Sequence, residues 1–336
     1  MLRGGCIHSN FEYSIPIRTQ CEVIFSDVVA KENLYHAWND FIRGKRKRHD
    51  VSIFAARLAD NLDTLHHELI SDTYTHGSYE EYVICDPKKR IIHKASVRDR
   101  IVHRLLYNAL YSYFDRRFIH DSYSCRIGKG THKARAQFRI YANTVSQNYT
   151  KPCFILKFDI KKCFESIDQG VLRHLLSAYI EDKNILNLIV SIIDSFTKGL
   201  PLGNLTSQLF INIYLHELDY VVKQKINVTY YIRYADDVVV LSDDRQELVL
   251  IFWHVNLFLK QTLKLIVHKI SISSLYGGVD MLGEVFFPKY KRLRRSTERR
   301  MRRRDCEGLK KSASRDDVIL IMGAGDVTQV ATKLIS

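Results

Sequence analysis

Residues 230–241 read YYIRYADDVVVL, and the fold is decided by this stretch. Two runs of aromatic and β-branched residues flank Ala235, Asp236 and Asp237, a pattern that predicts a β-hairpin with the acids at its turn. A polar turn is the simplest explanation for adjacent aspartates. Carboxylates held close together repel each other, however, and burial between apolar strands adds a desolvation cost. We therefore favour divalent metal ions between them.

A second predicted strand supplies a third acid. Residues 154–158 read FILKF, and Asp159 follows them directly. If this strand lies beside the hairpin, three carboxylates form a site for two Mg²⁺ ions, for which Mn²⁺ can substitute. Asp159 and Asp236 would ligate both ions, with Asp237 adjacent and the backbone carbonyl of Ile160 as a further ligand. Such a site activates a 3′-hydroxyl and stabilises a leaving pyrophosphate.

The composition indicates a globular protein with a polyanionic partner. The chain has 336 residues, 46% of them hydrophobic, and a net charge of +14, which suits nucleic acid or an anionic membrane. It contains no apolar run of about 18 residues, so we expect no transmembrane helix. The N-terminal residues lack a secretory signal, and the seven cysteines form no close pairs. We therefore expect a cytoplasmic protein without disulfides or structural zinc.

Periodicity places the remaining elements. The pattern predicts helices over 26–42, 53–70, 97–118, 170–180, 184–196, 206–223 and 246–263, a hairpin over 79–94, and strands over 264–271 and 277–286. Thr206 and Ser207 are candidate caps of the helix that they begin.

Three further features could bind a nucleotide, and each has a structural alternative. Lys88, Lys89 and Arg90 lie at the tip of the 79–94 hairpin, which could fold over a triphosphate or could simply be a solubilising loop. Arg126 lies in a Gly-rich loop before a helix, a place that can cradle phosphate. Phe164, five residues past Asp159, could pack under the sugar of an incoming nucleotide or belong to the core.

The segment 289–311 carries twelve Lys and Arg against three acids. It has too few apolar residues for a membrane-surface helix, so a helix along a phosphate backbone is favoured over a solvated face. The candidate template or primer contacts in it are Arg299, Arg300, Arg302, Arg303 and Arg304.

From about residue 33 to 300, the sequence resembles the reverse transcriptases, with their motifs in family order. Phe158-Asp159 with Phe164 resembles the first palm motif, and residues 234–237 resemble the Tyr-x-Asp-Asp box. Residues 98–100 and 122–132 resemble the first and second fingers motifs. Residues 263–269 resemble the strand whose lysine lies near the leaving pyrophosphate, and residues 281–283 resemble the primer-grip turn.

This resemblance implies an α/β (α+β) right-hand polymerase with an antiparallel palm sheet backed by helices. The implied domains are an N-terminal helical extension (1–75), fingers (76–152), palm (153–287, with finger and palm helices at 170–200) and a short basic thumb (288–336). The implied activity is RNA-directed DNA synthesis from dNTPs on a template RNA, with a primer and cDNA. The resemblance adds Lys269 as proton donor to pyrophosphate, Gln208 beside the nucleotide, and Leu202, Gly203, Tyr234, Leu282 and Gly283 along the template and primer.

The loop LGNLTSQ at 202–208 narrows the resemblance. Group II intron-type enzymes carry Gln-Gly and Ser-Pro here, whereas this chain has Leu202 and Gln208, as in the reverse transcriptases of diversity-generating retroelements. That subfamily implies cDNA mutagenised at template adenines and a small basic helical accessory protein. After Arg304 the sequence departs from the family. A phage-defence reverse transcriptase and a non-catalytic RNA-binding relic therefore stay open, although the intact acids argue against the relic.

Overall fold

The computed structural model describes residues 19–85 and 89–312, with side chains as far as residue 303. Lys88, the side chain of Arg304 and the tail from residue 313 lie outside the described residues. Among the described helices, none is long and apolar enough to cross a membrane.

A four-stranded antiparallel sheet forms the centre of the molecule, in the order β4-β5-β3-β6. Its strands are β3 (Phe154–Ile160), β4 (Tyr231–Tyr234), β5 (Asp237–Ser242) and β6 (Val267–Ser274). β4 and β5 form the predicted hairpin, in which Tyr234 pairs with Asp237. β3 pairs with β5, placing Phe158 opposite Val238. The prediction that the strand before Asp159 lies beside the hairpin is confirmed.

Successive side chains of the sheet point to opposite faces and pack into two separate hydrophobic cores. Leu156 and Phe158 point to one face, where α10 (Leu205–Tyr220) and α11 (Arg245–Gln261) pack with most of the other helices. Ile155 and Val239 point to the opposite face, which α6 (Thr131–Val145) covers. The same face meets a small sheet of β7 (Val279–Met281), β8 (Glu284–Phe286) and β9 (Lys291–Leu293).

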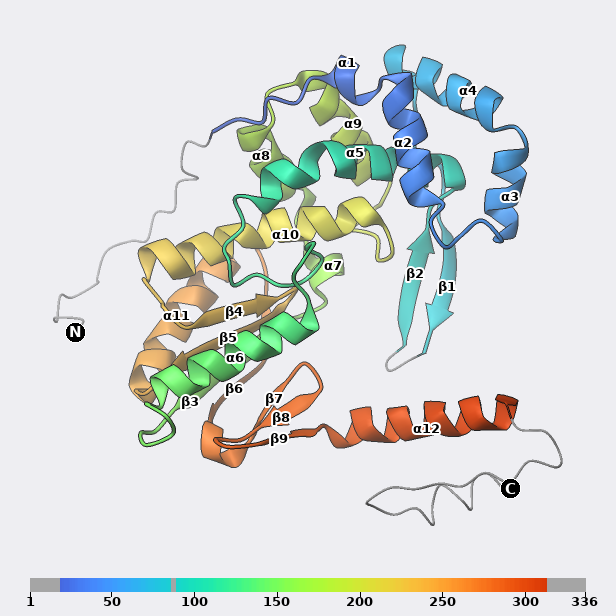
Figure 1. The fold of residues 1–336 in the computed structure, drawn as a ribbon. Coiled ribbons are helices and arrows are strands. Elements are labelled where there is room, and N and C mark those ends of the chain that lie inside the picture. Colours follow the sequence, from blue (N-terminus) through green and yellow to red (C-terminus); the bar gives the residue numbers. More distant parts are fainter. Residues whose placement is uncertain (1–18, 86–88, 313–336) are drawn as a thin grey trace.

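The other helices stack on α10, on its side away from the sheet, and a hairpin projects from them (Figure 1). The helices are α1 (Phe25–Val28), α2 (Lys31–Phe41), α3 (His49–Ala56), α4 (Leu58–Ile70), α5 (Val97–Asp115), α8 (Gln169–Tyr179) and α9 (Lys183–Asp194). The hairpin, predicted over 79–94, is β1 (Glu80–Ile84) with β2 (Arg90–Lys94). The basic helix α12 (Arg295–Ser312) leaves the three-stranded sheet and extends beyond it.

Several predicted boundaries are wrong, for local reasons. The helix expected over 53–70 is two helices, because Arg57 has φ −129° and ψ 45° and interrupts the helical path. The strand expected from Lys264 begins at Val267, because Lys264 adopts φ +51°, outside the strand region.

The predicted caps at the start of α10 are also wrong. Asn204 occupies the cap position and makes no side-chain cap bond. The hydroxyl of Thr206 is instead engaged by Nδ1 of the buried His103, at 2.6 Å. Ser207 is buried inside the first turn.

Candidate active site

The turn between β4 and β5 has a strained backbone. Ala235 lies between Tyr234 and Asp236 and adopts φ +54°, the left-handed region. For a residue with a Cβ, this conformation costs about 1–2 kcal/mol. Neighbouring groups must therefore hold the turn in place.

A buried arginine provides that support. Arg233 is fully buried, and its Nε and Nη2 each donate to the carboxylate of Asp219 on α10 at 2.7 Å. Its Nη1 donates to Oδ1 of Asn212 at 3.1 Å and to the carbonyl of Ala235 at 3.2 Å. The hydroxyl of Tyr231 donates to Asp219 at 2.7 Å. The ion pair thus joins the strained turn to the helix behind the sheet.

The sequence analysis did not predict the Arg233–Asp219 ion pair. Its signal was available, since Arg233 stands inside an otherwise apolar strand and Asp219 inside an apolar helix. A charge in such a place is almost always paired.

The structure brings the three predicted carboxylates within electrostatic reach of one another. Burial raises the pKa of Asp236, and the charges of Asp237 and Asp159 raise it further. Burial also raises the pKa of Asp237, with Asp159 again adding and Lys157 opposing. The negative charge of Asp159 therefore disfavours the ionised forms of both Asp236 and Asp237. Such repulsion is expected at a site that binds cations.

The donor set fits a divalent cation that takes its remaining ligands from water and substrate oxygens. Oδ1 of Asp159 is buried and has no hydrogen-bond partner among the described residues. In that same part of the chain, no three His, Cys, Asp or Glu side chains are already arranged to hold a metal ion. Mg²⁺ usually binds one or two carboxylates, waters and substrate phosphates rather than a complete protein cage. Ile160, whose carbonyl is a predicted ligand, ends β3 and pairs with Val267.

The basic residues predicted to contact a triphosphate differ in their surroundings. Arg90 begins β2, is exposed, and lies near enough to Asp236 to oppose the rise in its pKa. Lys89 beside it is also exposed. The guanidinium of Arg126, in contrast, donates to Asp115 and to the carbonyls of Ile119 and Ser122, at 2.7–3.0 Å. Lys89 and Arg90 are therefore better placed for a phosphate than Arg126.

Phe164 lies in a short helix just after Asp159. That helix, α7 (Cys163–Ser166), leaves Phe164 half-buried against the larger core. Its backbone carbonyl accepts a hydrogen bond from the amide of Leu200 at 2.8 Å. Gln208 is half-buried on α10. The partial exposure of Phe164 is compatible with both of its predicted roles.

The loop before α10 packs on the projecting hairpin. The carbonyl of Leu202 accepts from the amide of His93 on β2 at 2.8 Å. Gly203 has φ +122°, and a Cβ there would lie 2.8 Å from Cγ2 of Ile92. Glycine is required at this contact because the backbone is left-handed and the space is filled.

The predicted primer-grip turn closes the β7–β8 hairpin. Leu282 and Gly283 adopt φ +51° and +93°, as a two-residue hairpin turn demands. Arg135 of α6 donates to the carbonyl of Leu282, and the carbonyl of Gly283 accepts from the amide of Arg294 at 3.0 Å.

A groove of about 610 Å³ opens beside this turn. We call it the thumb groove, and its lining is Cys85, Thr131, Leu282, Gly283, Arg294, Ser296, Thr297, Arg299, Arg300 and Arg303. Thr131 is hydrogen-bonded to the hydroxyl of Tyr234 at 3.1 Å, so the groove adjoins the β4–β5 turn. Arg302 does not line it and pairs with Glu298 at 2.8 Å.

Lys269 lies at an irregularity of β6. Lys157 pairs with Ser271 and Asp159 with His268, so the register shifts between them. Lys269 is exposed there and has φ +50°. Its position beside the partner of Asp159 agrees with a role near the carboxylates, and that role stays a prediction.

Comparisons with known proteins agree with this geometry. Residues 86–287 match the family described as reverse transcriptase (RNA-dependent DNA polymerase). The chain is 27% identical over 180 residues to an uncharacterized 91 kDa protein in the cob intron of Schizosaccharomyces pombe, an alignment covering 48% of this chain and 21% of that protein. It is 31% identical over 117 residues to the retron Ec73 reverse transcriptase of Escherichia coli, covering 31% and 37% of the two chains.

Among solved structures, telomerase from Candida albicans, in complex with the TWJ fragment of telomeric RNA, superposes with a TM-score of 0.51 at 12% identity. That match covers 72% of this chain and 50% of the telomerase chain. The protein therefore has the right-hand polymerase fold. It spans about a fifth of the length of its intron-encoded relative. With more than half of its residues matched, the chain belongs to the reverse transcriptase family.

Proposed function

We propose that this chain is an RNA-directed DNA polymerase that copies a template RNA into cDNA from dNTPs. The observation that carries the proposal is the convergence of Asp159, Asp236 and Asp237 at one end of the central sheet, within the family-matching segment. A relic without catalytic function would have no need for three mutually repelling, half-buried acids.

Asp159 and Asp236 would hold two Mg²⁺ ions, with Mn²⁺ as a substitute, and Asp237 beside them. Bound there, these ions would activate the primer 3′-hydroxyl and stabilise the leaving pyrophosphate. Arg90 and Lys89 are the protein groups that we assign to the triphosphate, and Lys269 the proton donor to pyrophosphate.

Phe164 and Gln208 would contact the incoming nucleotide, with Phe164 excluding a ribose 2′-hydroxyl. The thumb groove would take the template–primer duplex, with α12 along its phosphate backbone. In this proposal β1–β2 belongs to the fingers, the central sheet to the palm and α12 to the thumb.

We further propose that the enzyme serves a diversity-generating retroelement, with a small basic helical protein as partner. Leu202 stands where group II intron-type enzymes have glutamine, and it lacks an amide that could hydrogen-bond near the nascent base pair. Weaker geometric checking of that pair would follow. The alternative is a bacterial defence polymerase, and the similarity to a retron reverse transcriptase of Escherichia coli is compatible with a bacterial enzyme of either kind.

Primer extension by the purified chain on a defined RNA template with Mg²⁺ tests the proposal. We expect templated DNA whose errors concentrate opposite adenine, and at least a thousandfold loss, about 4 kcal/mol of transition-state stabilisation, in Asp236→Asn. Faithful or untemplated DNA would support the assignment as a polymerase but would favour the defence role over the retroelement role. DNA synthesis retained by Asp236→Asn would contradict the catalytic assignment.

A further inference from the structure

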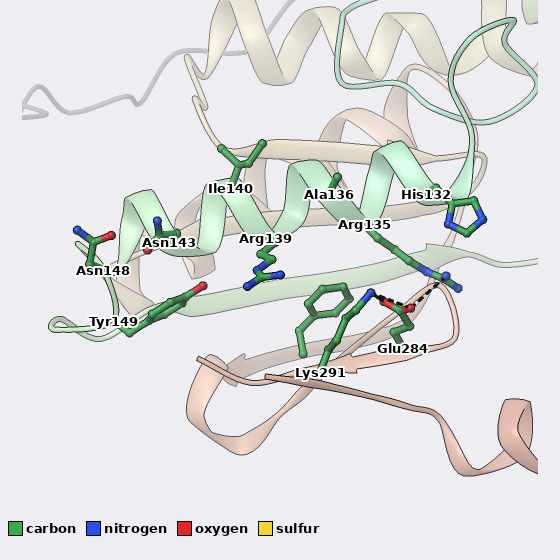
Figure 2. Close-up of a pocket in the computed structure, with 11 residues that line it drawn as sticks. His132, Arg135, Ala136, Arg139, Ile140, Asn143, Asn148, Tyr149, Glu284 and Lys291 are labelled. Atoms are coloured by element: carbon green, nitrogen blue, oxygen red, sulfur yellow. Dashed lines mark hydrogen bonds and ion pairs between the residues drawn. The ribbon is translucent and has the colours of Figure 1, made fainter. Parts of the chain in front are cut away.

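A second groove lies between α6 and the strands β8 and β9 (Figure 2). It consists of two adjoining cavities of about 680 and 160 Å³, which share Arg139, Tyr149, Phe286 and Lys291. We call it the α6 groove. His132 lies near one end of it and Tyr149 at the other, with β8 and β9 forming the opposite wall. The polymerase reaction described above uses none of this surface.

The α6 groove is cationic. Four basic side chains line it, namely Arg135, Arg139, Lys289 and Lys291, against a single acid, Glu284. Glu284 is shared by Lys291 at 2.9 Å and Arg135 at 3.5 Å. Arg139 and Lys289 form no hydrogen bond or ion pair with any described residue. The groove therefore holds two positive charges that the described fold does not use.

Aromatic side chains accompany these charges. The smaller cavity is lined by Tyr149, Phe286, Phe287 and Tyr290. The rings of Phe287 and Tyr290 stack with centroids 4.6 Å apart and planes 12° from parallel, and Tyr290 is 61% exposed. An exposed aromatic ring beside unpaired cations is a combination that binds single-stranded nucleic acid, through base stacking and phosphate contacts.

The α6 groove lies next to the thumb groove. Thr131 lines the thumb groove and His132 the α6 groove. Arg135 lines the α6 groove and donates to the carbonyl of Leu282, which lines the thumb groove. An RNA strand that leaves the active site could therefore continue into the α6 groove without a break.

We propose that the α6 groove binds a single-stranded RNA segment outside the template–primer duplex. In a duplex the bases stack on one another and are not available to stack on Tyr290, so the occupant must be unpaired. An acidic polypeptide would satisfy Arg139 and Lys289 but would leave the stacked rings of Phe287 and Tyr290 without a role. This inference does not depend on which genetic element the polymerase serves.

The test uses the full chain with its active site already filled by an excess of RNA–DNA primer–template. Binding of a fluorescent oligouridine RNA to this complex is measured over a range of salt concentrations. We expect Arg139→Gln/Lys289→Gln to weaken the binding at least tenfold and to reduce the salt slope by about 1.4, the value for two lost contacts to a single strand. The charge-matched Lys225→Gln/Lys260→Gln, whose exposed lysines lie at the ends of η1 (Val221–Lys225) and α11, should bind as the wild type does.

Two further readouts separate the proposal from its alternatives. Tyr290→Ala should weaken oligouridine binding without changing the salt slope, and primer extension should be unchanged in every groove variant. The proposal is overturned if the filled wild type binds no oligouridine, or if the Arg139/Lys289 variant binds it normally. It is also overturned if that variant loses primer–template affinity to the same extent, or if polyglutamate binds the groove in place of RNA.

Discussion

The β4–β5 turn and α12 are both rich in charge, but they hold it in opposite ways. Arg233 is fully buried and has one carboxylate partner in a two-point contact. Arg299 and Arg303 lie on an exposed helix and face the thumb groove. A buried charge acts through its exact position, since an unpaired partner is costly. Exposed charges act together through the field that they create, and each one contributes little.

The buried pair should give the largest effect on stability. Arg233→Met leaves Asp219 unpaired in the core, so we expect a loss of about 3–5 kcal/mol in the free energy of unfolding. Chemical denaturation measures it. Arg233→Met/Asp219→Leu should recover much of the lost stability, because it removes both charges. Its activity should stay low, because the carbonyl of Ala235 loses the hydrogen bond from Arg233.

The exposed pair Arg57–Asp60 is the matched control, with side chains 77% and 68% exposed. Arg57→Met should leave the unfolding midpoint nearly unchanged. Equal losses from Arg57→Met and Arg233→Met would remove the contrast between the two kinds of charge.

A buried histidine should also make the stability of the fold depend on pH. Burial, helped by His76, lowers the pKa of His103 from 6.5 to about 3. Between about pH 6.5 and pH 3, His103 is therefore protonated in the unfolded chain but not in the folded one. The free energy of unfolding falls as the pH is lowered through this range. The slope should reach about 1.4 kcal/mol per pH unit for this one proton.

Unfolding midpoints from pH 7 to pH 4 check this prediction. His103→Gln should flatten the profile, whereas substitution of the exposed His174 by Gln should leave it as in the wild type. An unchanged profile in His103→Gln would mean that another group controls the acid sensitivity.

Phe164 is half-buried, intermediate between the buried Arg233 and the exposed arginines of α12. Phe164→Ala should let ribonucleotides in and reduce the preference for dNTPs at least tenfold, about 1.4 kcal/mol. Paired extension reactions with dNTPs and NTPs measure the preference. A variant that loses stability and keeps its sugar selectivity would make Phe164 a core residue only.

Single substitutions in α12 should have the smallest effects. We expect Arg299→Gln to weaken template–primer binding less than tenfold and to reduce the salt slope by about 0.9, the value for one phosphate contact. Arg302→Gln is the comparison, because Arg302 pairs with Glu298 outside the thumb groove. A hundredfold loss from Arg299→Gln alone would mean that Arg299 acts through its exact position, as the buried Arg233 does.

The two regions also differ in how far the sequence predicts them. The β4–β5 hairpin and β3 follow from local alternation and turn chemistry, and the structure has them where they were expected. The 282–283 turn is expected from the resemblance alone, because the local pattern predicts one strand over 277–286, which is wrong: the segment forms β7 and β8. The Arg233–Asp219 pair lies 14 residues apart, and its two charges in apolar elements signal a pairing without giving its geometry. The Thr206–His103 bond joins residues 103 positions apart, which no local pattern encodes. The α6 groove likewise needs α6 and β9 to meet across the fold. The functional roles of the individual site residues stay predictions.

The stability of the metal-free protein tests the metal site most directly. The pKa of Asp236 is raised by burial and by its neighbouring acids, so above its ordinary pKa the ionised carboxylate destabilises a fold that holds no cation. In a chelator at neutral pH, Asp236→Asn should therefore unfold at a higher temperature than the wild type, while Asp243→Asn, at an exposed acid just after β5, should not. Adding Mn²⁺ with primer–template and dNTP should raise the wild-type midpoint much more than that of Asp236→Asn. A lower midpoint for Asp236→Asn in the chelator, together with equal metal responses, would contradict the metal site.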